Sequence, residues 1–308
     1  GKFKQAISLL EKHVQRFGAT AETFYHLGCF YANQDSAKYP EALQAFERST
    51  RQAPDFWRSN LMMGHIYLST GQIDEAISAY TRAEDYQPYH SEVLLAFAHA
   101  AYLNGDLKTA ESKLSLILKN EPDHSQALDI LGKILERQDK YSEASQAFRK
   151  SGHPLNLGRV LCKTGCYEEA RDVLFAEYDR GNDSDELLNY LGFSLSQIDE
   201  YDAALNIWQK LLDRYPEDKF LALNITYLNY LSGFQHYHNR DYPVAVLQWE
   251  QYLRQYPEDQ SFRKHLATLY GKIGLSEIFR ERQLDTEKAR TWMKRAVELD
   301  GEDPDYRF

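Results

Sequence analysis

The sequence has few of the residues that mark several other classes of protein. Its 308 residues include only three cysteines, Cys29, Cys162 and Cys166. A secreted chain held together by disulfides would usually carry more cysteines, and an even number of them. The count favours a reducing compartment. We therefore expect a cytoplasmic protein, with the periplasm as the alternative.

Long apolar runs are also missing. The longest nearly apolar stretch is Val93–Leu103, which His99 interrupts and which is too short to span a bilayer. The sequence opens at Gly1 with no charged region followed by an apolar one, so it shows no targeting segment. We expect a soluble protein with no direct membrane insertion.

Positive charge is scarce. The chain carries 36 Lys and Arg residues against 46 Asp and Glu residues, for a formal net charge of −10. A surface that neutralises phosphates or docks on an anionic membrane needs the opposite balance. We therefore expect no nucleic-acid partner. With only 9 prolines and no Gly/Ser-rich linker, the chain is also predicted to be one continuous array.

What the sequence does contain is a repeat with a period of 34 residues. The order is small, large, turn, small, large, small, proline, and most of these positions keep their size from unit to unit. One unit shows this order at Gly64, Tyr67, Gly71, Ala76, Tyr80, Ala83 and Pro88, and the next at Ala98, Ala101, Gly105, Ala110, Leu114, Ile117 and Pro122. A later unit has it at Gly192, Leu195, Asp199, Ala204, Trp208, Leu211 and Pro216. Self-similarity at a fixed period is typical of a solenoid of stacked units.

The positions within a unit predict a pair of helices. A small residue in the first helix and an alanine in the second let two antiparallel helices approach closely, because neither presents a bulky side chain where they cross. Gly71 and Gly105 lie between the two helical stretches, where a left-handed residue ends a helix without a steric penalty. Pro54, Pro88 and Pro122 stop the second helix. Each unit is therefore helix, turn, helix and stop, and the fold class is all-α.

This pattern resembles the tetratricopeptide repeat (TPR) over essentially the whole chain. The resemblance implies a right-handed superhelical solenoid of antiparallel helix pairs that works by binding another protein. We expect a half repeat at 1–20 and full repeats near 21–56, 57–90, 91–124, 125–152, 153–184, 185–218, 219–259 and 260–303. Solenoids need capped ends. The predicted array starts with a half repeat and has no polar capping helix after its last repeat, so we expect it to be part of a longer protein.

The repeat near 21–56 has two extra residues in its turn, between Gly28 and Ala42, and three later repeats depart further from the period. Ala144 and Ala170 are 26 residues apart rather than 34, and Pro154 falls inside the first helix of that repeat, which predicts a shortened helix. The last two repeats are longer than the period, which predicts long first helices at 219–239 and 260–283.

The first of these long helices carries an aromatic stripe. Its members recur at spacings of three and four residues, as on one face of a helix. They are Phe220, Tyr227, Tyr230, Phe234 and Tyr237. The stripe is either core between the two long helices or a face for homodimer formation or domain docking.

Catalytic and cofactor motifs are missing from the sequence. It contains neither G-x-S-x-G nor G-x-x-x-x-G-K-[ST], and no strand is expected. His236 and His238 are two residues apart on a helix and point in different directions, so they do not share a metal ion. Cys162 and Cys166, with His153 upstream, are the other metal candidates, although we favour buried, inert thiols. We expect no enzyme activity, no cofactor and no metal.

In a TPR array, fixed positions of each first helix line a concave groove, so the resemblance implies a binding surface for an extended partner segment. Tyrosine, histidine and asparagine at these positions offer contact area and hydrogen bonds at modest entropic cost. The alternative is that they only pack on neighbouring helices or solvate the inner wall. The candidates are Tyr25, His26, Arg58, His65, His99, Tyr102, Lys133, Asn156, Arg159, Asn189, Tyr190, Phe193, Asn224, Tyr227, Tyr230, Lys264, His265 and Lys272.

Two of these candidates occupy the same position in adjacent repeats. Stacked helices lie about 8–10 Å apart, so His65 and His99 are too distant for one metal ion but suited to successive residues of an extended ligand. Some family members clamp the C-terminal carboxylate of a chaperone with lysine and asparagine, but Tyr25 and Cys29 stand at those positions here.

Three functions stay open at this point. The first is a non-catalytic scaffold or adaptor that binds a protein or peptide segment. The second is a regulatory or targeting region of a larger enzyme or of a secretion or assembly machine. The third is a chaperone for a secreted or assembling substrate. Fold and groove are common to all three.

Overall fold

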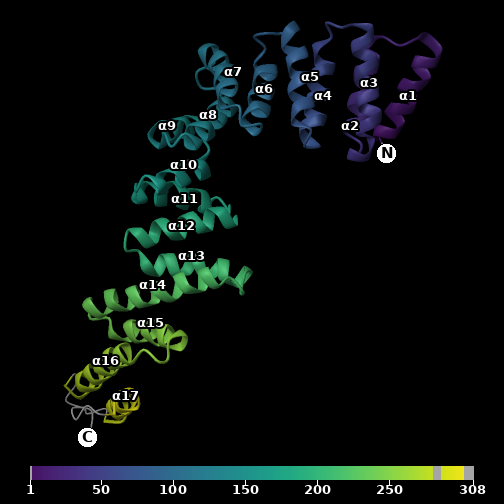
Figure 1. The fold of residues 1–308 in the computed structure, drawn as a ribbon. Coiled ribbons are helices and arrows are strands. Elements are labelled where there is room, and N and C mark those ends of the chain that lie inside the picture. The colour runs from purple at the N-terminus through teal and green to yellow at the C-terminus, as the bar shows by residue number, and fades with distance from the viewer. Residues whose placement is uncertain (1, 280–285, 302–308) are drawn as a thin grey trace. The chain divides into compact units, whose positions relative to one another are not determined.

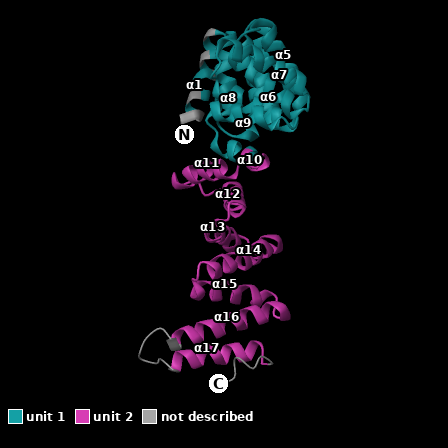
Figure 2. Cartoon of the chain, turned by 90° about the vertical axis from the view of Figure 1, so that its left-hand side faces the viewer, with its two compact units in different colours: residues 1–160 teal, residues 161–308 magenta. Residues whose placement is uncertain are grey.

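The computed structural model describes residues 2–279 and 286–301 (Figure 1). In these residues the secondary structure is helical, and no strand is present. The helices form two compact units, Gly1–Val160 and Leu161–Phe308, with α10 passing from the first into the second (Figure 2). The predicted all-α class is confirmed.

The helix bounds follow the expected alternation of first and second helices. Up to the unit boundary they are α1 (Lys2–Phe17), α2 (Ala21–Ala32), the short 3₁₀ helix η1 (Ser36–Lys38), α3 (Tyr39–Gln52), α4 (Trp57–Ser69), α5 (Ile73–Tyr86), α6 (Ser91–Leu103), α7 (Leu107–Asn120), α8 (Ser125–Arg137), α9 (Tyr141–Ser151) and α10 (Pro154–Lys163). The rest are α11 (Tyr167–Asp179), α12 (Asp185–Gln197), α13 (Tyr201–Arg214), α14 (Lys219–His238), α15 (Tyr242–Gln255), α16 (Gln260–Phe279) and α17 (Thr286–Leu299).

Consecutive helices pack in pairs, and within each unit a pair packs on the next. In unit 1 the pairs are α2 with α3, α4 with α5, α6 with α7 and α8 with α9. The first helices α2, α4, α6 and α8 also contact one another in succession, and we call them the first-helix layer of unit 1. In unit 2 the pairs are α12 with α13, α14 with α15 and α16 with α17. The predicted solenoid of helix pairs is thus present.

The two helices of a pair meet where a glycine of the first faces an aromatic ring of the second. A Cβ atom added to Gly64 would lie 2.3 Å from Cε1 of Tyr80, and one added to Gly132 would lie 2.6 Å from Cε1 of Phe148. Carbon atoms do not approach so closely, so these sites accept only glycine beside an aromatic ring. The same pairing recurs at Gly28 and Phe46, Gly192 and Trp208, and Gly233 and Trp249.

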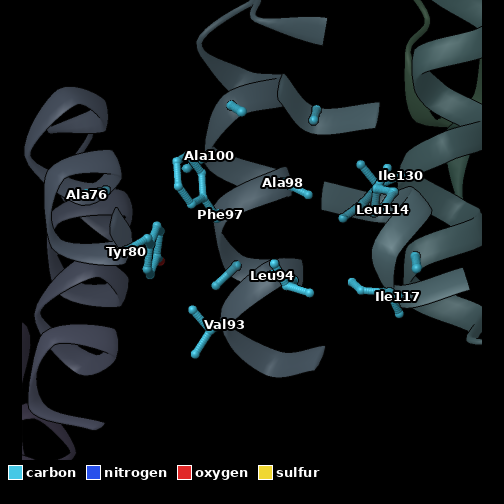
Figure 3. Packing of buried hydrophobic residues seen from close by; sticks show 14 of the residues in the cluster. Ala76, Tyr80, Val93, Leu94, Phe97, Ala98, Ala100, Leu114, Ile117 and Ile130 are labelled. Atoms are coloured by element: carbon cyan, nitrogen blue, oxygen red, sulfur yellow. The ribbon is translucent and has the colours of Figure 1, made fainter. Parts of the chain in front are cut away.

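The pair of α6 and α7 makes this contact with other residues. Ala98 stands where the five pairs just named have glycine, and Leu114 stands where they have an aromatic ring. Both side chains are fully buried, and Ala98 points toward α7 (Figure 3). The smaller leucine leaves room for the methyl group of the alanine, so the two positions change together.

The turn inside each pair uses a residue with positive φ. Gly71 and Gly105 have φ values of 78° and 82°. Just after them, the N–H groups of Gln72 and Asp106 donate to carbonyl groups in the last turn of the preceding helix, at 2.8 and 2.9 Å. These bonds satisfy helix-end carbonyls. The predicted role of the two glycines is confirmed.

Three turns place a larger residue in this left-handed conformation. Asp139, Asp199 and Arg240 have φ values of 59°, 61° and 63°. The conformation costs a residue with a Cβ atom about 1–2 kcal/mol relative to glycine. The two aspartates accept hydrogen bonds from the hydroxyl groups of Tyr141 and Tyr201. The described contacts include no such bond for the arginine.

Helix lengths follow the departures from the period. The helix that begins at Pro154 has 10 residues, against 13 for α8 and α12. Both α14 and α16 have 20 residues. The shortened helix and the two long helices are thus confirmed, while residues 280–283 of the second long helix lie outside the described residues. Within the described ranges, no helix has both the length and the apolar character needed to cross a membrane.

The glycine–aromatic contact predicts a coupled pair of substitutions. We expect Gly64→Ala to lower the free energy of unfolding by about 1–3 kcal/mol, because the new methyl group would overlap Tyr80. Combining it with Tyr80→Leu recreates the Ala98 and Leu114 pair, so the double variant should lose less stability than the sum of the two single variants. Urea unfolding of all three variants measures this coupling, and strictly additive losses would contradict it.

The strained turn predicts a stabilising substitution. We expect Arg240→Gly to raise the free energy of unfolding by about 0.5–1 kcal/mol, because glycine adopts positive φ without strain. Asn239 is a matched control, since it is the preceding residue and has a φ of −76°. Asn239→Gly relieves no strain and should not stabilise the chain. Equal shifts of the urea midpoint for the two variants would show that the turn is not strained.

Candidate functional site

A cavity of about 420 Å³ opens among the first helices of unit 1. Its apolar lining comes from Leu95, Ala96 and Ile130, which lie on α6 and α8. Its polar lining comes from α4, α6, α8 and the turn before α10. This polar set is His65, Glu92, His99, Tyr102, Gln126, Asp129, Lys133 and His153. Four of the sequence candidates, at positions 65, 99, 102 and 133, therefore meet at one cavity, which we call the histidine cavity.

Asp129 organises one side of the histidine cavity. Its Oδ2 atom lies 2.8 Å from Nζ of Lys133, and its Oδ1 atom accepts a hydrogen bond from Nδ2 of Asn156 at 2.7 Å. Nδ1 of His153 lies 2.8 Å from the same Oδ1 atom. Asp129 is 8% exposed, so these neighbours compensate a nearly buried acid. Two predicted groove residues, Lys133 and Asn156, thus hold an acid that sequence reasoning missed.

The pKa values of the two stacked histidines, His65 and His99, are lower than usual. Nδ1 of His65 lies 3.0 Å from the hydroxyl oxygen of Tyr80, and burial lowers the pKa of His65, with Glu92 opposing and His99 reinforcing the change. Partial burial also lowers the pKa of His99, although the residue keeps an exposed surface; the charge of Lys133 lowers it too, while Asp129 opposes the change. Both imidazoles are therefore mainly neutral at pH 7.

Tyr25, which was predicted to line the groove, packs against aromatic rings of the core. Its ring centroid lies 5.9 Å from that of Phe46 and 5.3 Å from that of Phe56. Burial, together with the neighbouring Cys29, raises the pKa of Tyr25 to about 12. The hydroxyl is thus neutral throughout the physiological range.

The other candidates of unit 1 lie away from the histidine cavity. His26 is exposed on α2. Arg58 is exposed on α4, with its guanidinium carbon 5.0 Å from the ring centroid of Trp57. Nη2 of Arg159 lies 2.8 Å from Oε2 of Glu136, so an acid of α8 compensates the charge of this predicted groove residue.

A second hollow, of about 200 Å³, lies between α12 and α14 of unit 2. Three sequence candidates line it, namely Phe193, Asn224 and Tyr227, together with Trp208 and Leu228. The exposed fractions of Phe193 and Tyr227 are 37% and 59%. We call this the aromatic hollow, and it presents aromatic rings beside the amide groups of Gln197 and Asn224.

The neighbouring candidates of unit 2 divide between surface and core. Asn189 is exposed, and Tyr190 is half-buried. Tyr230 packs against Phe262 and Tyr252, at ring-centroid distances of 5.2 and 5.4 Å. Tyr230 therefore belongs mainly to the core of unit 2.

The candidates on α16 are exposed. Lys264 and His265 both lie at the surface, and Nδ1 of His265 lies 2.9 Å from the carbonyl oxygen of Ser261. Nζ of Lys272 donates to the hydroxyl oxygen of Tyr237 and lies 4.8 Å from its ring centroid. None of these three residues reaches the aromatic hollow.

The aromatic stripe of α14 is core over part of its length and surface over the rest. Tyr230, Phe234 and Tyr237 pack on the buried cluster of α15 and α16. Phe220 and Tyr227 are 82% and 59% exposed. The docking alternative therefore rests on these last two rings.

The metal candidates have other partners. Nε2 of His236 lies 2.7 Å from Oδ2 of Asp202, whereas Nδ1 of His238 lies 2.8 Å from a backbone carbonyl oxygen of its own helix. Cys162 is buried, which raises its pKa to about 11, but Cys166 is exposed, so the prediction that both thiols are buried is wrong for the second. Among the described residues, no group of three or more His, Cys, Asp and Glu is placed to hold a metal ion.

Three models of one family match the sequence. Each describes the tetratricopeptide repeat, and they cover residues 30–91, 71–134 and 189–218. The chain is a tetratricopeptide-repeat protein. Its repeats support a role as a protein-interaction scaffold, which is the broad form of the function expected from the sequence.

Two curated relatives share part of this TPR array. Protein O-mannosyl-transferase TMTC1 of Homo sapiens is 25% identical over 211 residues, which are 63% of this chain and 22% of that protein. Tetratricopeptide repeat protein 21A of Mus musculus is 28% identical over 90 residues, 29% of this chain and 7% of that protein. The TPR array thus spans a minor part of both relatives.

A solved structure shares the fold. PilW, described as a widely conserved type IV pilus biogenesis factor, superposes with a TM-score of 0.58 at 15% sequence identity. The match covers 67% of this TPR array and 98% of PilW. At this identity the likeness concerns the fold alone.

The lowered pKa values of His65 and His99 predict loss of stability in mild acid. In the unfolded chain each imidazole takes up its proton near pH 6.5, whereas the folded chain does so at lower pH. The unfolded state therefore binds more protons in that window, and stability is lost as the pH falls through it. We expect His99→Gln to weaken the fall of the unfolding midpoint between about pH 7.5 and about pH 5.5. An identical pH dependence in the variant and the parent chain would contradict this.

Proposed function

We propose that this TPR array is a non-catalytic scaffold that binds an extended segment of a partner protein along its first helices. The observation that carries the proposal is the histidine cavity, where side chains from three successive first helices, α4, α6 and α8, meet. An extended segment that crosses these helices would place successive side chains against successive repeats.

The aromatic hollow supports the same function in unit 2. Exposed aromatic rings such as Phe193 and Tyr227 supply large contact area at low entropic cost, and the amide of Asn224 can bond a peptide backbone. Each unit therefore offers its own place for a side chain of the partner, and the proposal does not depend on how the units are arranged.

Groove variants test this proposal. We expect His99→Ala with Tyr102→Ala, and separately Phe193→Ala with Tyr227→Ala, to reduce partner capture by about tenfold or more, since loss of an aromatic anchor often costs ~2 kcal/mol. Crosslinking and mass spectrometry of the full chain in lysate from its source give the amount of partner and its contact sites.

Matched controls lie outside both sites. Tyr89 and Leu247 are 73% and 51% exposed, on the turn before α6 and on α15. Tyr89→Ala and Leu247→Ala should leave capture within about twofold of the parent chain. A partner that survives both groove variants and crosslinks to Phe220 or to α16 would place binding on the long helices and overturn the proposal.

A second function is favoured by one observation. TMTC1 is a protein O-mannosyl-transferase, and this chain matches 22% of its length. We propose as the second candidate that this array is the targeting or regulatory region of a larger enzyme. In that case the crosslinked segment would lie in the same polypeptide, and the full-length gene product would show it. The likeness to PilW concerns the fold and does not favour a chaperone function.

A further inference from the structure

Glu92 is the uncompensated acid of the histidine cavity. It lies on the first turn of α6, lines the cavity and is exposed. Among the described residues, no hydrogen bond or ion pair engages its side chain. The other acid, Asp129, is compensated by Lys133, Asn156 and His153.

The charged groups around the cavity are not evenly paired. The lining carries two carboxylates, Glu92 and Asp129, and both Lys133 and His153 lie against Asp129 rather than against Glu92. On α4, Arg58 lies over the ring of Trp57. On α8, Arg137 lies over the ring of Tyr102. The remaining charged groups of these helices pair elsewhere, so a cation in the cavity would find Glu92 free to receive it.

The apolar lining fits a particular kind of side chain. Leu95, Ala96 and Ile130 form an apolar wall next to Glu92 and the two imidazoles. Lysine and arginine have an aliphatic stem that packs on apolar surface and a charged end that pairs with a carboxylate. A volume of about 420 Å³ is ample for one such side chain.

We propose that the histidine cavity receives a lysine or arginine side chain of the partner segment, with Glu92 as its ion-pair partner, and that protonation of His65 and His99 in mild acid releases it. This proposal rests on the proposed scaffold function and adds the chemistry of the bound segment and a means of regulation.

The geometry makes release in acid a direct consequence of binding in the cavity. His65 lines it from α4, and His99 lines it from α6, the helix that also carries Glu92. Because their pKa values are lowered, both imidazoles are mainly neutral at pH 7. Protonation in mild acid adds two positive charges next to the partner's cation. The third imidazole, His153, lies against Asp129, which would compensate its charge. Binding of the cation and protonation therefore oppose each other, and the coupling is reciprocal.

The experiment uses the full chain and a phage-displayed library of random short peptides, selected at about pH 7.5. We expect the enriched peptides to share a lysine or arginine. Titration calorimetry with the most enriched synthetic peptide should show about tenfold weaker binding to Glu92→Gln, as for loss of a charge-assisted contact. Glu75→Gln removes an exposed acid on α5, outside the cavity, and should leave the affinity unchanged.

The acid release has its own measurement. The affinity of the parent chain for this peptide should fall by about tenfold or more between about pH 7.5 and about pH 5.5, and His99→Gln should reduce that fall. His99 is exposed, so this variant should fold even if a substitution of His65, which contacts Tyr80, does not.

The outcomes separate this inference from the proposed function. Enriched peptides without a basic residue, or equal binding to Glu92→Gln and the parent chain, would overturn the assignment of the cation. A pH dependence unchanged in His99→Gln would overturn the release mechanism. If the enriched peptides nevertheless bound the His99→Ala, Tyr102→Ala variant more weakly than the parent chain, the scaffold function would stand. Failure to enrich any peptide, or indifference to all groove variants, would overturn both.

Discussion

The contact between a glycine of one helix and an aromatic ring of its partner determines the spacing within five of the helix pairs, and much else follows from that spacing. At Gly64 and Tyr80 the ring lies where a methyl group would have to be, so the two helices cross with no side chain between them at that point. Close crossing lets the rest of each first helix face its neighbours in the layer rather than its own partner. A wider crossing would need larger side chains there and would change the surface that the first helices present.

The tight contact also explains why the binding surface can vary without changing the fold. Positions 65, 99 and 133 are equivalent in three successive repeats and carry His, His and Lys, and all three line one cavity. None of them is the small residue on which the helix pair depends. The chemistry of the groove is therefore set by residues that the fold leaves free, which is why fold alone does not identify a ligand.

The sequence was sufficient for the helix pairs, the glycine turns, the shortened α10 and the two long helices, because each depends on residues within one repeat. It also predicted that His65 and His99 share a surface, because equivalent positions stack. It missed Asp129, whose partners Asn156 and His153 lie where the repeat is out of register, so no periodic rule relates them. It could have been suspected from an acid placed between Leu128 and Ile130 in an otherwise apolar stretch of α8.

Tyr25 and Tyr230 show the limit of position rules in another way. Both occupy expected groove positions, yet both rings pack on aromatic neighbours that are particular to their repeats, Phe56 for the first and Phe262 for the second. Large rings bury wherever a neighbour offers a surface, and this depends on the adjacent repeat rather than on the period. The groove rule therefore predicts which residues face inward, but not which of them stay accessible.

Position 133 is equivalent to positions 65 and 99 but carries a lysine instead of a histidine, and this lysine affects both Asp129 and His99. Its ammonium group lies 2.8 Å from Asp129, so the acid that could otherwise compete for a cation already has a partner. Its charge also lowers the pKa of His99, which helps to keep that imidazole neutral near pH 7. One residue thus leaves Glu92 as the acid available to a ligand and makes the neighbouring histidine responsive to acid. A histidine at 133 would weaken both effects, since it would compensate Asp129 only when protonated.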